Sequence, residues 1–146
     1  MYYNYGMKSI VPKVVVSGVV INDGKVLVIQ RAASDTHPGL WEIPGGGKEP
    51  LEKCEDAVKR EVKEETGLTI EIKKLVGVFD YTTEKEDCIK DCTQINYLVK
   101  PIGKVEVNLS TEHEGFAWIT ENEINNYNIS KETKEVIMKA FLQKVE

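Results

Sequence analysis

The sequence is poor in the residues that build zinc sites and disulfide frameworks. It contains three cysteines, Cys54, Cys88 and Cys92, and two histidines, His37 and His113. A zinc knuckle needs further ligands at matching spacing, and no second pair matches the step from Cys88 to Cys92. We therefore expect Cys88 and Cys92 to be surface thiols of a reducing cytoplasm rather than zinc ligands, and Cys54 to be a small core residue.

Long hydrophobic runs and an excess of positive charge are also missing. No apolar stretch approaches the roughly 18 residues that a membrane span requires, and the N-terminus lacks a signal-peptide pattern. The net charge of −5 disfavours a surface for duplex nucleic acid, because such surfaces are usually basic. These absences predict a cytoplasmic protein with neither a membrane nor a duplex as partner. They are compatible with a small anionic substrate held through a metal.

The chain is long enough to bury a core within one domain. It has 146 residues, of which 41% are hydrophobic and 29% are charged, as is ordinary for a globular protein. Residues 13–146 are predicted to form the domain, and residues 1–12 an N-terminal arm that begins with a loose MYYNYGM segment. No internal repeat or low-complexity tract interrupts this organisation.

Hydrophobic patterning predicts strands over much of the chain and helices at only three places. Strands are predicted at residues 13–21, 25–31, 40–43, 69–81, 93–100 and 115–119, and helices at 51–65, after Thr120 with a capping box to Glu123, and at 131–145. Residues 22–24 predict a hairpin, residues 45–47 a glycine turn, and residues 82–92 a polar, mobile loop. Because strands and helices do not alternate regularly, we expect an α+β fold with a mixed sheet packed between helices.

The helix predicted at 51–65 carries acids where an amphipathic helix usually carries apolar residues. At 3.6 residues per turn, Glu61, Glu64 and Glu65 share the direction of the apolar side chains, and Gly67 follows as a left-handed cap. Neighbouring like charges repel, acids near a C-terminus oppose the helix dipole, and inward carboxylates lose water. A cation offsets all three costs, and hard oxygen ligands favour Mg²⁺ or Mn²⁺. The alternative is a solvated acidic helix end paired with lysine and arginine.

The same stretch resembles a known family. The pattern Gly46-x5-Glu52-x7-Arg60-Glu61-Val62-x-Glu64-Glu65-x-Gly67-Leu68 matches the Nudix box at every specified position. The preceding GLWEIPGG is similar to MutT-like members, and Trp118-Ile119 before TENE resembles the family's late strand and short helix. The resemblance implies an α/β/α sandwich that hydrolyses a nucleoside diphosphate linked to another group, with Mg²⁺ or Mn²⁺ as cofactor. It also makes a homodimer an expectation.

Positions in the box imply which residues bind the metal. The resemblance assigns this role to Glu61, Glu64 and Glu65, joined by a backbone carbonyl near Gly45 or Gly46 and by Glu52 as an auxiliary acid. In the family, such ions neutralise the diphosphate and help to generate the attacking hydroxide.

The Nudix box says less about the roles of the remaining site residues. The resemblance implies that Arg60 orients a carboxylate through an ion pair, although a solvated arginine is the alternative. Glu112, on the loop before the late strand, is the preferred general base; a helix glutamate is the other choice, and a solvated loop acid is the alternative role for Glu112. Arg31 is a candidate phosphate contact, with an ordinary strand-end charge as the alternative. Candidates to stack on a nucleobase, unless they are core residues, are Trp41, Phe79, Tyr81 and Tyr97.

The substrate is inferred mainly from which subgroup markers are missing. Residues 83–86 hold neither the proline of the family's ADP-ribose subgroup nor the tyrosine of its dinucleoside-polyphosphate subgroup. The resemblance therefore favours a MutT-type nucleoside triphosphate pyrophosphohydrolase, with ADP-ribose or another nucleotide sugar as the alternative. A non-catalytic nucleotide-binding regulatory module is the alternative from a different class, and the intact acids of the helix disfavour it.

Overall fold

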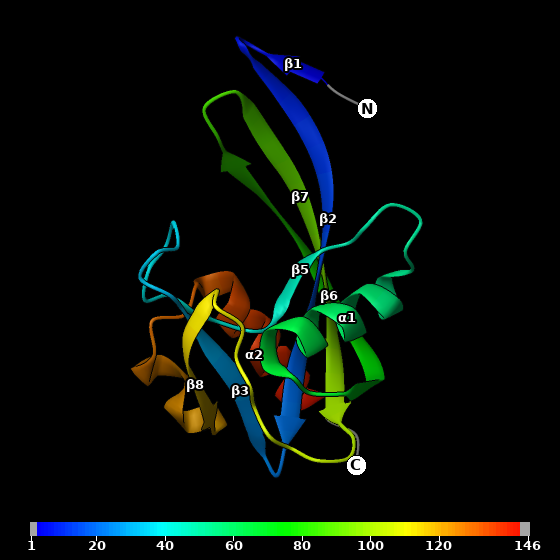
Figure 1. Ribbon diagram of the computed structural model, residues 1–146, viewed down its shortest axis with the longest axis vertical. Helices are drawn as coiled ribbons and strands as arrows, with labels where there is room; N and C mark the ends of the chain where they lie inside the picture. Colours follow the sequence, from blue (N-terminus) through cyan, green and yellow to red (C-terminus); the bar gives the residue numbers. More distant parts are fainter. Residues whose placement is uncertain (1–2, 144–146) are drawn as a thin grey trace.

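The computed structural model describes residues 3–143, which form a curled mixed sheet with a helix on each face (Figure 1). The strands are β1 (Tyr3–Tyr5), β2 (Lys8–Asn22), β3 (Lys25–Arg31), β4 (Trp41–Glu42), β5 (Gly45–Gly47), β6 (Ile70–Glu84), β7 (Cys88–Pro101) and β8 (His113–Ile119). The helices are α1 (Cys54–Thr66), the 3-10 helix η1 (Glu121–Asn126) and α2 (Lys131–Leu142). None of these helices is both long and apolar enough to cross a membrane.

Strand β2 connects the parts of the sheet. Along one edge it pairs in parallel with β7 from Ser9 to Val20, and β6 pairs with β7 beyond it. Along its other edge it pairs in antiparallel fashion with β1, β5 and β3 in turn. The sheet continues from β3 to β4 and β8. Every other strand of the sheet therefore lies one or two strand positions away from β2.

The two long helices cover opposite faces of this sheet. Val58 of α1 belongs to one buried cluster with Val16 of β2, whereas Ile137 of α2 belongs to a second cluster with Val19. Successive side chains of a strand point to opposite faces, so neighbouring valines of β2 pack against different helices. The predicted α+β fold, with a mixed sheet between helices, is confirmed.

Short-range signals in the sequence fold as predicted. Asp23 and Gly24 adopt φ values of 52° and 75°, as a tight hairpin between β2 and β3 requires. Gly67 ends α1 with a φ of 77°, and its N–H donates to the carbonyl of Lys63. The Thr120–Glu123 capping box is also present, although the helix that follows is 3-10 rather than α.

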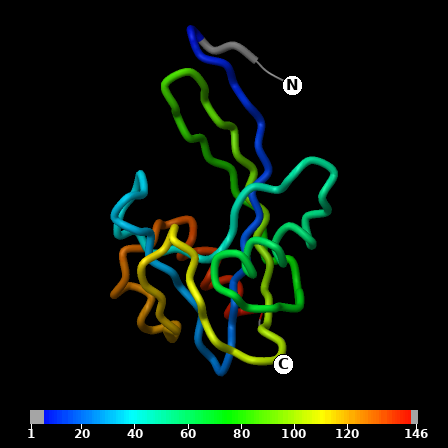
Figure 2. Tube along the Cα trace, viewed as in Figure 1, coloured from blue at the N-terminus to red at the C-terminus, as the bar shows by residue number. Residues whose placement is uncertain are grey.

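A projecting β-ribbon was not predicted. Strand β2 begins at Lys8 rather than at residue 13, so most of the expected N-terminal arm is paired strand; Met1 and Tyr2 lie outside the described residues. Residues 82–92 form the end of the β6–β7 hairpin rather than a loop. We call residues 3–13 and 80–92 the β-ribbon, which extends away from both helices (Figures 1 and 2). Its sequence has few of the apolar residues from which a strand is predicted, because the β-ribbon contributes little to the core.

Three further predictions need correction. Residues 45–47 form a strand paired with β2 rather than a turn, because pairing overrides the glycine composition. The last helix is described to Leu142, and the expected extension to residue 145 lies outside the described part of the chain. Cys92 is buried rather than superficial, and all three cysteines are free.

Candidate active site

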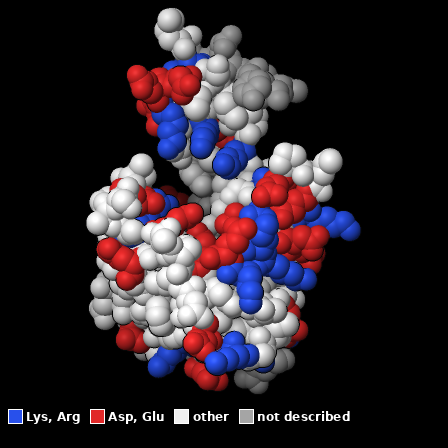
Figure 3. Space-filling model, in the orientation of Figure 1, with Lys and Arg blue, Asp and Glu red and all other residues white. Residues whose placement is uncertain are grey.

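A cleft of about 560 Å³ lies between the β-ribbon and the body of the protein. Strands β2, β6 and β7 form one wall, and β4, β5, β8 and the start of α2 contribute to the rest. Figure 3 shows basic side chains along the β-ribbon facing acidic side chains on the body across a hollow. The cleft therefore has walls of opposite charge.

Glu65 is the buried acid at the floor of this cleft. It lies in the last turn of α1 and is only 7% exposed. One of its carboxylate oxygens accepts the backbone N–H of Gly45 at 2.8 Å. Burial, opposed by this hydrogen bond and reinforced by the nearby charge of Glu42, raises the pKa of Glu65 to about 8. The side chain therefore carries much of its charge only when a cation or a high pH favours it.

The glycine strand β5 brings its backbone close to these acids. Gly46 pairs with Val16, so its own N–H and C=O are directed towards β2, whereas the N–H of Gly45 points to Glu65. The N–H and C=O of one strand residue point to the same edge, so the carbonyl facing α1 belongs to Gly45 rather than to Gly46. Gly46 contributes space instead, because a Cβ there would lie 2.5 Å from the Glu61 carboxylate.

Replacing Gly46 with alanine is expected to displace the Glu61 carboxylate without unfolding the protein. The clash is with the far end of a flexible side chain, so we expect a stability loss of about 1 kcal/mol and a metal affinity lower by roughly tenfold. Gly45→Ala is the contrasting variant, because its Cβ would lie 2.3 Å from the carbonyl oxygen of Val16 and should destabilise the fold itself. Urea unfolding and metal titration of both variants separate the two effects. Unchanged metal affinity in Gly46→Ala would show that Glu61 is not held as described.

Arg60 holds several acids of the site together. Its guanidinium donates to both oxygens of Glu52 at 2.8 and 2.9 Å, to Glu61 at 3.0 Å and to the carbonyl of Gly47 at 3.0 Å. The hydrogen bonds from Arg60 lower the pKa of Glu52 to about 2. Burial raises the pKa of Glu61, and the contact with Arg60 opposes that rise. Arg60 thus links Glu52, near the start of the Nudix box, to Glu61 on α1.

Two predicted metal ligands are placed differently from Glu61 and Glu65. The Glu64 side chain is 57% exposed and touches only the edge of the Arg60 guanidinium at 3.3 Å, so it does not lie on the buried stripe as predicted. Glu52 has both oxygens engaged by Arg60. Its position in the structure is that of a partner for the arginine.

A second, partly buried group of charges stands beside Glu65. Glu42 accepts two hydrogen bonds from Arg31, at 3.0 and 2.9 Å, through one oxygen, and its other oxygen lies 2.8 Å from Nε2 of His113. Burial alone would raise the pKa of Glu42, but His113 and Arg31 together hold it below its usual value. Arg31 lines the cleft, yet most of its donors are already used by Glu42 and Asp35, and its role as a phosphate contact stays a prediction.

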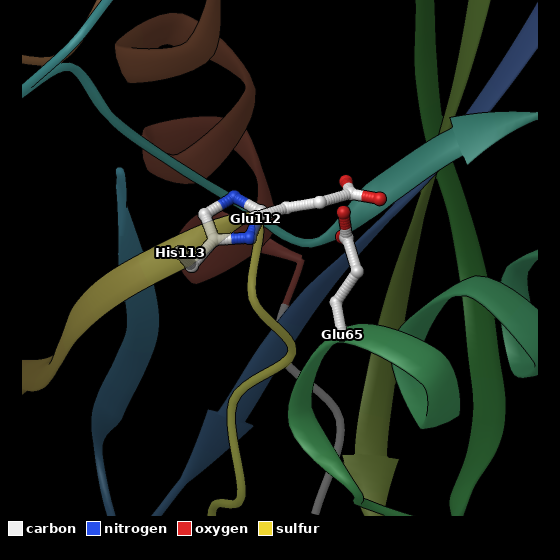
Figure 4. A group of neighbouring side chains, drawn as sticks. All are labelled: Glu65, Glu112 and His113. Atoms are coloured by element: carbon white, nitrogen blue, oxygen red, sulfur yellow. The ribbon is translucent and has the colours of Figure 1, made fainter. Parts of the chain in front are cut away.

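Glu112 reaches the same place from the loop before β8. Its carboxylate, that of Glu65 and a ring nitrogen of His113 offer ligand atoms that all lie within 4.8 Å of one another. Figure 4 shows the three side chains converging from the end of α1, the loop and the start of β8. The preferred general base is thus adjacent to the buried acid.

The predicted aromatic residues divide between the cleft and the core. Phe79 and Tyr81 of β6 line the cleft with ring centroids 5.9 Å apart, and Trp41 lines it while contacting the edge of Tyr127 at 5.0 Å. Tyr97 was a wrong candidate, because it is buried in the cluster under α1. Three aromatic side chains are thus available to a ligand in the cleft.

Three cleft lysines have no ion-pair partner within 4 Å among residues 3–143. Lys13 lies on β2, Lys85 in the β6–β7 turn and Lys90 on β7. A Cβ on Gly47 would lie 3.1 Å from the Lys13 ammonium nitrogen, so this glycine makes room for the lysine as Gly46 does for Glu61. No pattern in the sequence identified these lysines, since their shared position depends on how β2, β6 and β7 pair.

The chain belongs to the NUDIX family, because the NUDIX domain model matches residues 11–141. A MutT-like protein from Streptomyces ambofaciens is 39% identical over 111 residues, which make up 75% of this chain and 65% of that relative. The nucleoside triphosphatase NudI of Klebsiella pneumoniae is 26% identical over 137 residues, which are 84% of this chain and 92% of NudI. Proteins named ADP-ribose pyrophosphatase also occur among the matches.

A solved structure agrees with the fold described above. The crystal structure of a MutT NUDIX hydrolase from Burkholderia pseudomallei superposes with a TM-score of 0.74 at 25% identity, over 88% of this chain and 97% of that one. Family membership and fold therefore rest on the sequence and on the three-dimensional arrangement alike. Nudix hydrolases depend in general on divalent metals, and the acids of α1 provide the oxygen donors that such ions prefer.

Proposed function

We propose that this protein is a divalent-metal-dependent nucleoside triphosphate pyrophosphohydrolase. The observation that carries the proposal is the charge arrangement of the cleft, with carboxylates on its floor and, on its wall, three lysines without an ion pair among residues 3–143. A triphosphate fits this arrangement because a metal ion held by the carboxylates can neutralise one part of the phosphate chain and the lysines can neutralise the rest. NudI, which is similar over most of both chains, is named a nucleoside triphosphatase.

The residues that would hold the metal are Glu61, Glu64 and Glu65, with the carbonyl of Gly45. A bound Mg²⁺ or Mn²⁺ would screen the phosphates, polarise the phosphoryl group and lower the pKa of a bound water. The donor set fits this role, because it is built from hard oxygens and because a bound cation would stabilise the carboxylate of Glu65, whose pKa burial raises. The exposed Glu64 can swing inward at little cost.

Other residues of the chain orient the reactants. Arg60 keeps Glu61 and Glu52 in fixed positions through its fork of hydrogen bonds. Glu112 is placed to accept a proton from the attacking water, since it is an exposed acid beside Glu65. Phe79, Tyr81 and Trp41 offer ring faces on which a nucleobase can stack.

A substrate panel tests this function. Nucleoside triphosphates, ADP-ribose and dinucleoside polyphosphates are incubated with the protein and Mg²⁺ or Mn²⁺, and pyrophosphate and phosphate release are measured. We expect turnover of at least one triphosphate with pyrophosphate as a product. Preferential hydrolysis of ADP-ribose would replace the proposed substrate with the nucleotide-sugar alternative. Tight nucleotide binding without any turnover would favour a regulatory module.

Neutralising the lysines of the β-ribbon is expected to change substrate preference. In the double variant Lys85→Gln, Lys90→Gln, we expect kcat/KM for the triphosphate to fall by roughly 10-fold to 100-fold, because two charge-assisted phosphate contacts are lost. The lower activity on ADP-ribose, which has two phosphates, should change by less than about threefold. Lys100→Gln is the control, since Lys100 is exposed on β7 and does not line the cleft. An equal loss on both substrates would contradict a role in recognising the third phosphate.

A further inference from the structure

His113 is a buried side chain with only one of its two ring nitrogens satisfied. The side chain is 3% exposed. Its Nε2 lies 2.8 Å from a carboxylate oxygen of Glu42, whereas no group among the described residues forms a hydrogen bond with Nδ1. Only two other buried side-chain atoms in residues 3–143 share this condition, Oγ of Ser110 and Oε1 of Gln143. A buried nitrogen without a partner is costly unless a ligand occupies the position.

The contact with Glu42 determines which nitrogen carries the lone pair. Glu42 is held as a carboxylate by two hydrogen bonds from Arg31, so it can only accept. Nε2 must therefore donate its proton to Glu42, and neutral His113 keeps its lone pair on Nδ1. A histidine that donates one ring N–H to a carboxylate and keeps the other nitrogen free is the usual arrangement of a metal ligand.

The position of His113 agrees with this electronic arrangement. Ligand atoms of His113, Glu65 and Glu112 lie within 4.8 Å of one another, and the three side chains meet at the floor of the cleft (Figure 4). Two ligands on opposite sides of one ion at bond lengths of roughly 2.1 Å are separated by about 4.2 Å. A small movement of the exposed Glu112 side chain would shorten a separation of 4.8 Å to this value. A ring nitrogen of His113 and the two carboxylates are thus close enough to share an ion, and Nδ1 is the ring nitrogen that the contact with Glu42 leaves free.

We propose that Nδ1 of His113 joins the carboxylates of Glu65 and Glu112 in a mixed nitrogen and oxygen site for a divalent transition-metal ion. Imidazole binds Zn²⁺ and Co²⁺ well and Mn²⁺ more weakly, whereas Mg²⁺ prefers oxygen. The site therefore selects a transition metal over Mg²⁺ at this position. Glu112 can bind the ion through one oxygen and keep the other for a proton. The inference deepens the proposed function, since Glu65 serves in both, but metal binding can be measured without turnover.

Magnetic resonance of the Mn²⁺-loaded protein tests the nitrogen ligand directly. The chain has only two histidines, so the source of a histidine nitrogen can be identified by substitution. We expect a nitrogen coupling to bound Mn²⁺ in the native protein and in His37→Ala, the matched control. His113→Ala should lose the coupling and bind Mn²⁺ at least tenfold more weakly, with Mg²⁺ affinity changed by less than about twofold. Bound Mn²⁺ without a nitrogen coupling in the native protein would overturn the proposal.

A second measurement keeps the test decisive if His113→Ala fails to fold. Long-range proton–nitrogen spectra of the native protein labelled on histidine distinguish a protonated ring nitrogen from one with a lone pair. Before metal is added, His113 should show a lone pair on Nδ1, and Zn²⁺ should shift that resonance. A proton on Nδ1, or no response to Zn²⁺, would refute the site. Loss of this site with hydrolysis by Mg²⁺ retained would leave the proposed function standing.

Discussion

Replacing Glu65 with glutamine is expected to lower kcat by a factor on the order of 10³ while the fold is retained. Glutamine has the same shape and can still accept the backbone N–H of Gly45, so packing is preserved. It lacks the negative charge that the proposed metal requires. Initial rates with saturating Mg²⁺ and the far-ultraviolet circular dichroism spectrum of both proteins check the two halves of the prediction.

The same variant should be more stable than the native protein in alkaline buffer without metal. Burial raises the pKa of Glu65 to about 8, so the folded state holds a proton that the unfolded state releases above about 4.5. The metal-free native protein therefore loses stability as the pH rises from about 4.5 to 8, and glutamine removes this loss. Thermal unfolding with EDTA at pH 5 and pH 9 should show a gain for Glu65→Gln only at pH 9.

Glu64→Gln is the control for the stability measurement alone, because Glu64 lies on the same helix but is exposed. Its metal-free unfolding temperature should differ little from that of the native protein at either pH. If Glu65→Gln retained full activity, the assignment of Glu65 as a metal ligand would be wrong. If its stability showed no dependence on pH relative to the native protein, the buried acid would not titrate as described.

Replacing Arg60 with lysine is expected to lower kcat/KM by roughly 10-fold to 100-fold. Lysine keeps the positive charge but has a single ammonium group, so it cannot bind both oxygens of Glu52 and also reach Glu61 and the carbonyl of Gly47. Metal affinity should fall with activity, because Glu61 loses its orienting contact. Steady-state kinetics and titration with Mn²⁺ measure the two quantities.

Lys59→Ala serves as the matched surface variant for Arg60, since Lys59 is exposed on the same helix. It should change neither quantity by more than about twofold. Activity of Arg60→Lys within twofold of the native protein would indicate that charge alone is sufficient and that the fork of hydrogen bonds has no role in positioning.

Local features of this fold could be predicted from the sequence because each depends on a few adjacent residues. The hairpin at Asp23-Gly24, the left-handed cap at Gly67 and the capping box at Thr120 are of this kind. Helix periodicity also placed Glu65 on the buried side of α1. It failed for Glu64, because a direction at the edge of the apolar stripe does not determine whether a long side chain turns inward or outward.

Features that depend on pairing between distant segments could not be predicted. Where burial is described, the β-ribbon consists mainly of half-buried and exposed residues without apolar alternation, so its polar sequence resembled a loop. The contact of Glu42 with His113 joins residues 71 positions apart, and only the pairing of β3 with β4 and β8 brings them together. The shared position of the three cleft lysines could not be predicted either, because it depends on how β2, β6 and β7 pair.

The division of the cleft between two structural units has a consequence for how this protein can evolve. The acids and Arg60 belong to a helix and a glycine strand fixed to the buried core, where most substitutions are destabilising. The lysines and Tyr81 belong to the β-ribbon, which extends away from both helices, and side chains there can be exchanged at little cost to stability. Substrate preference can therefore change through single substitutions of surface residues, while the residues that cleave the bond stay the same.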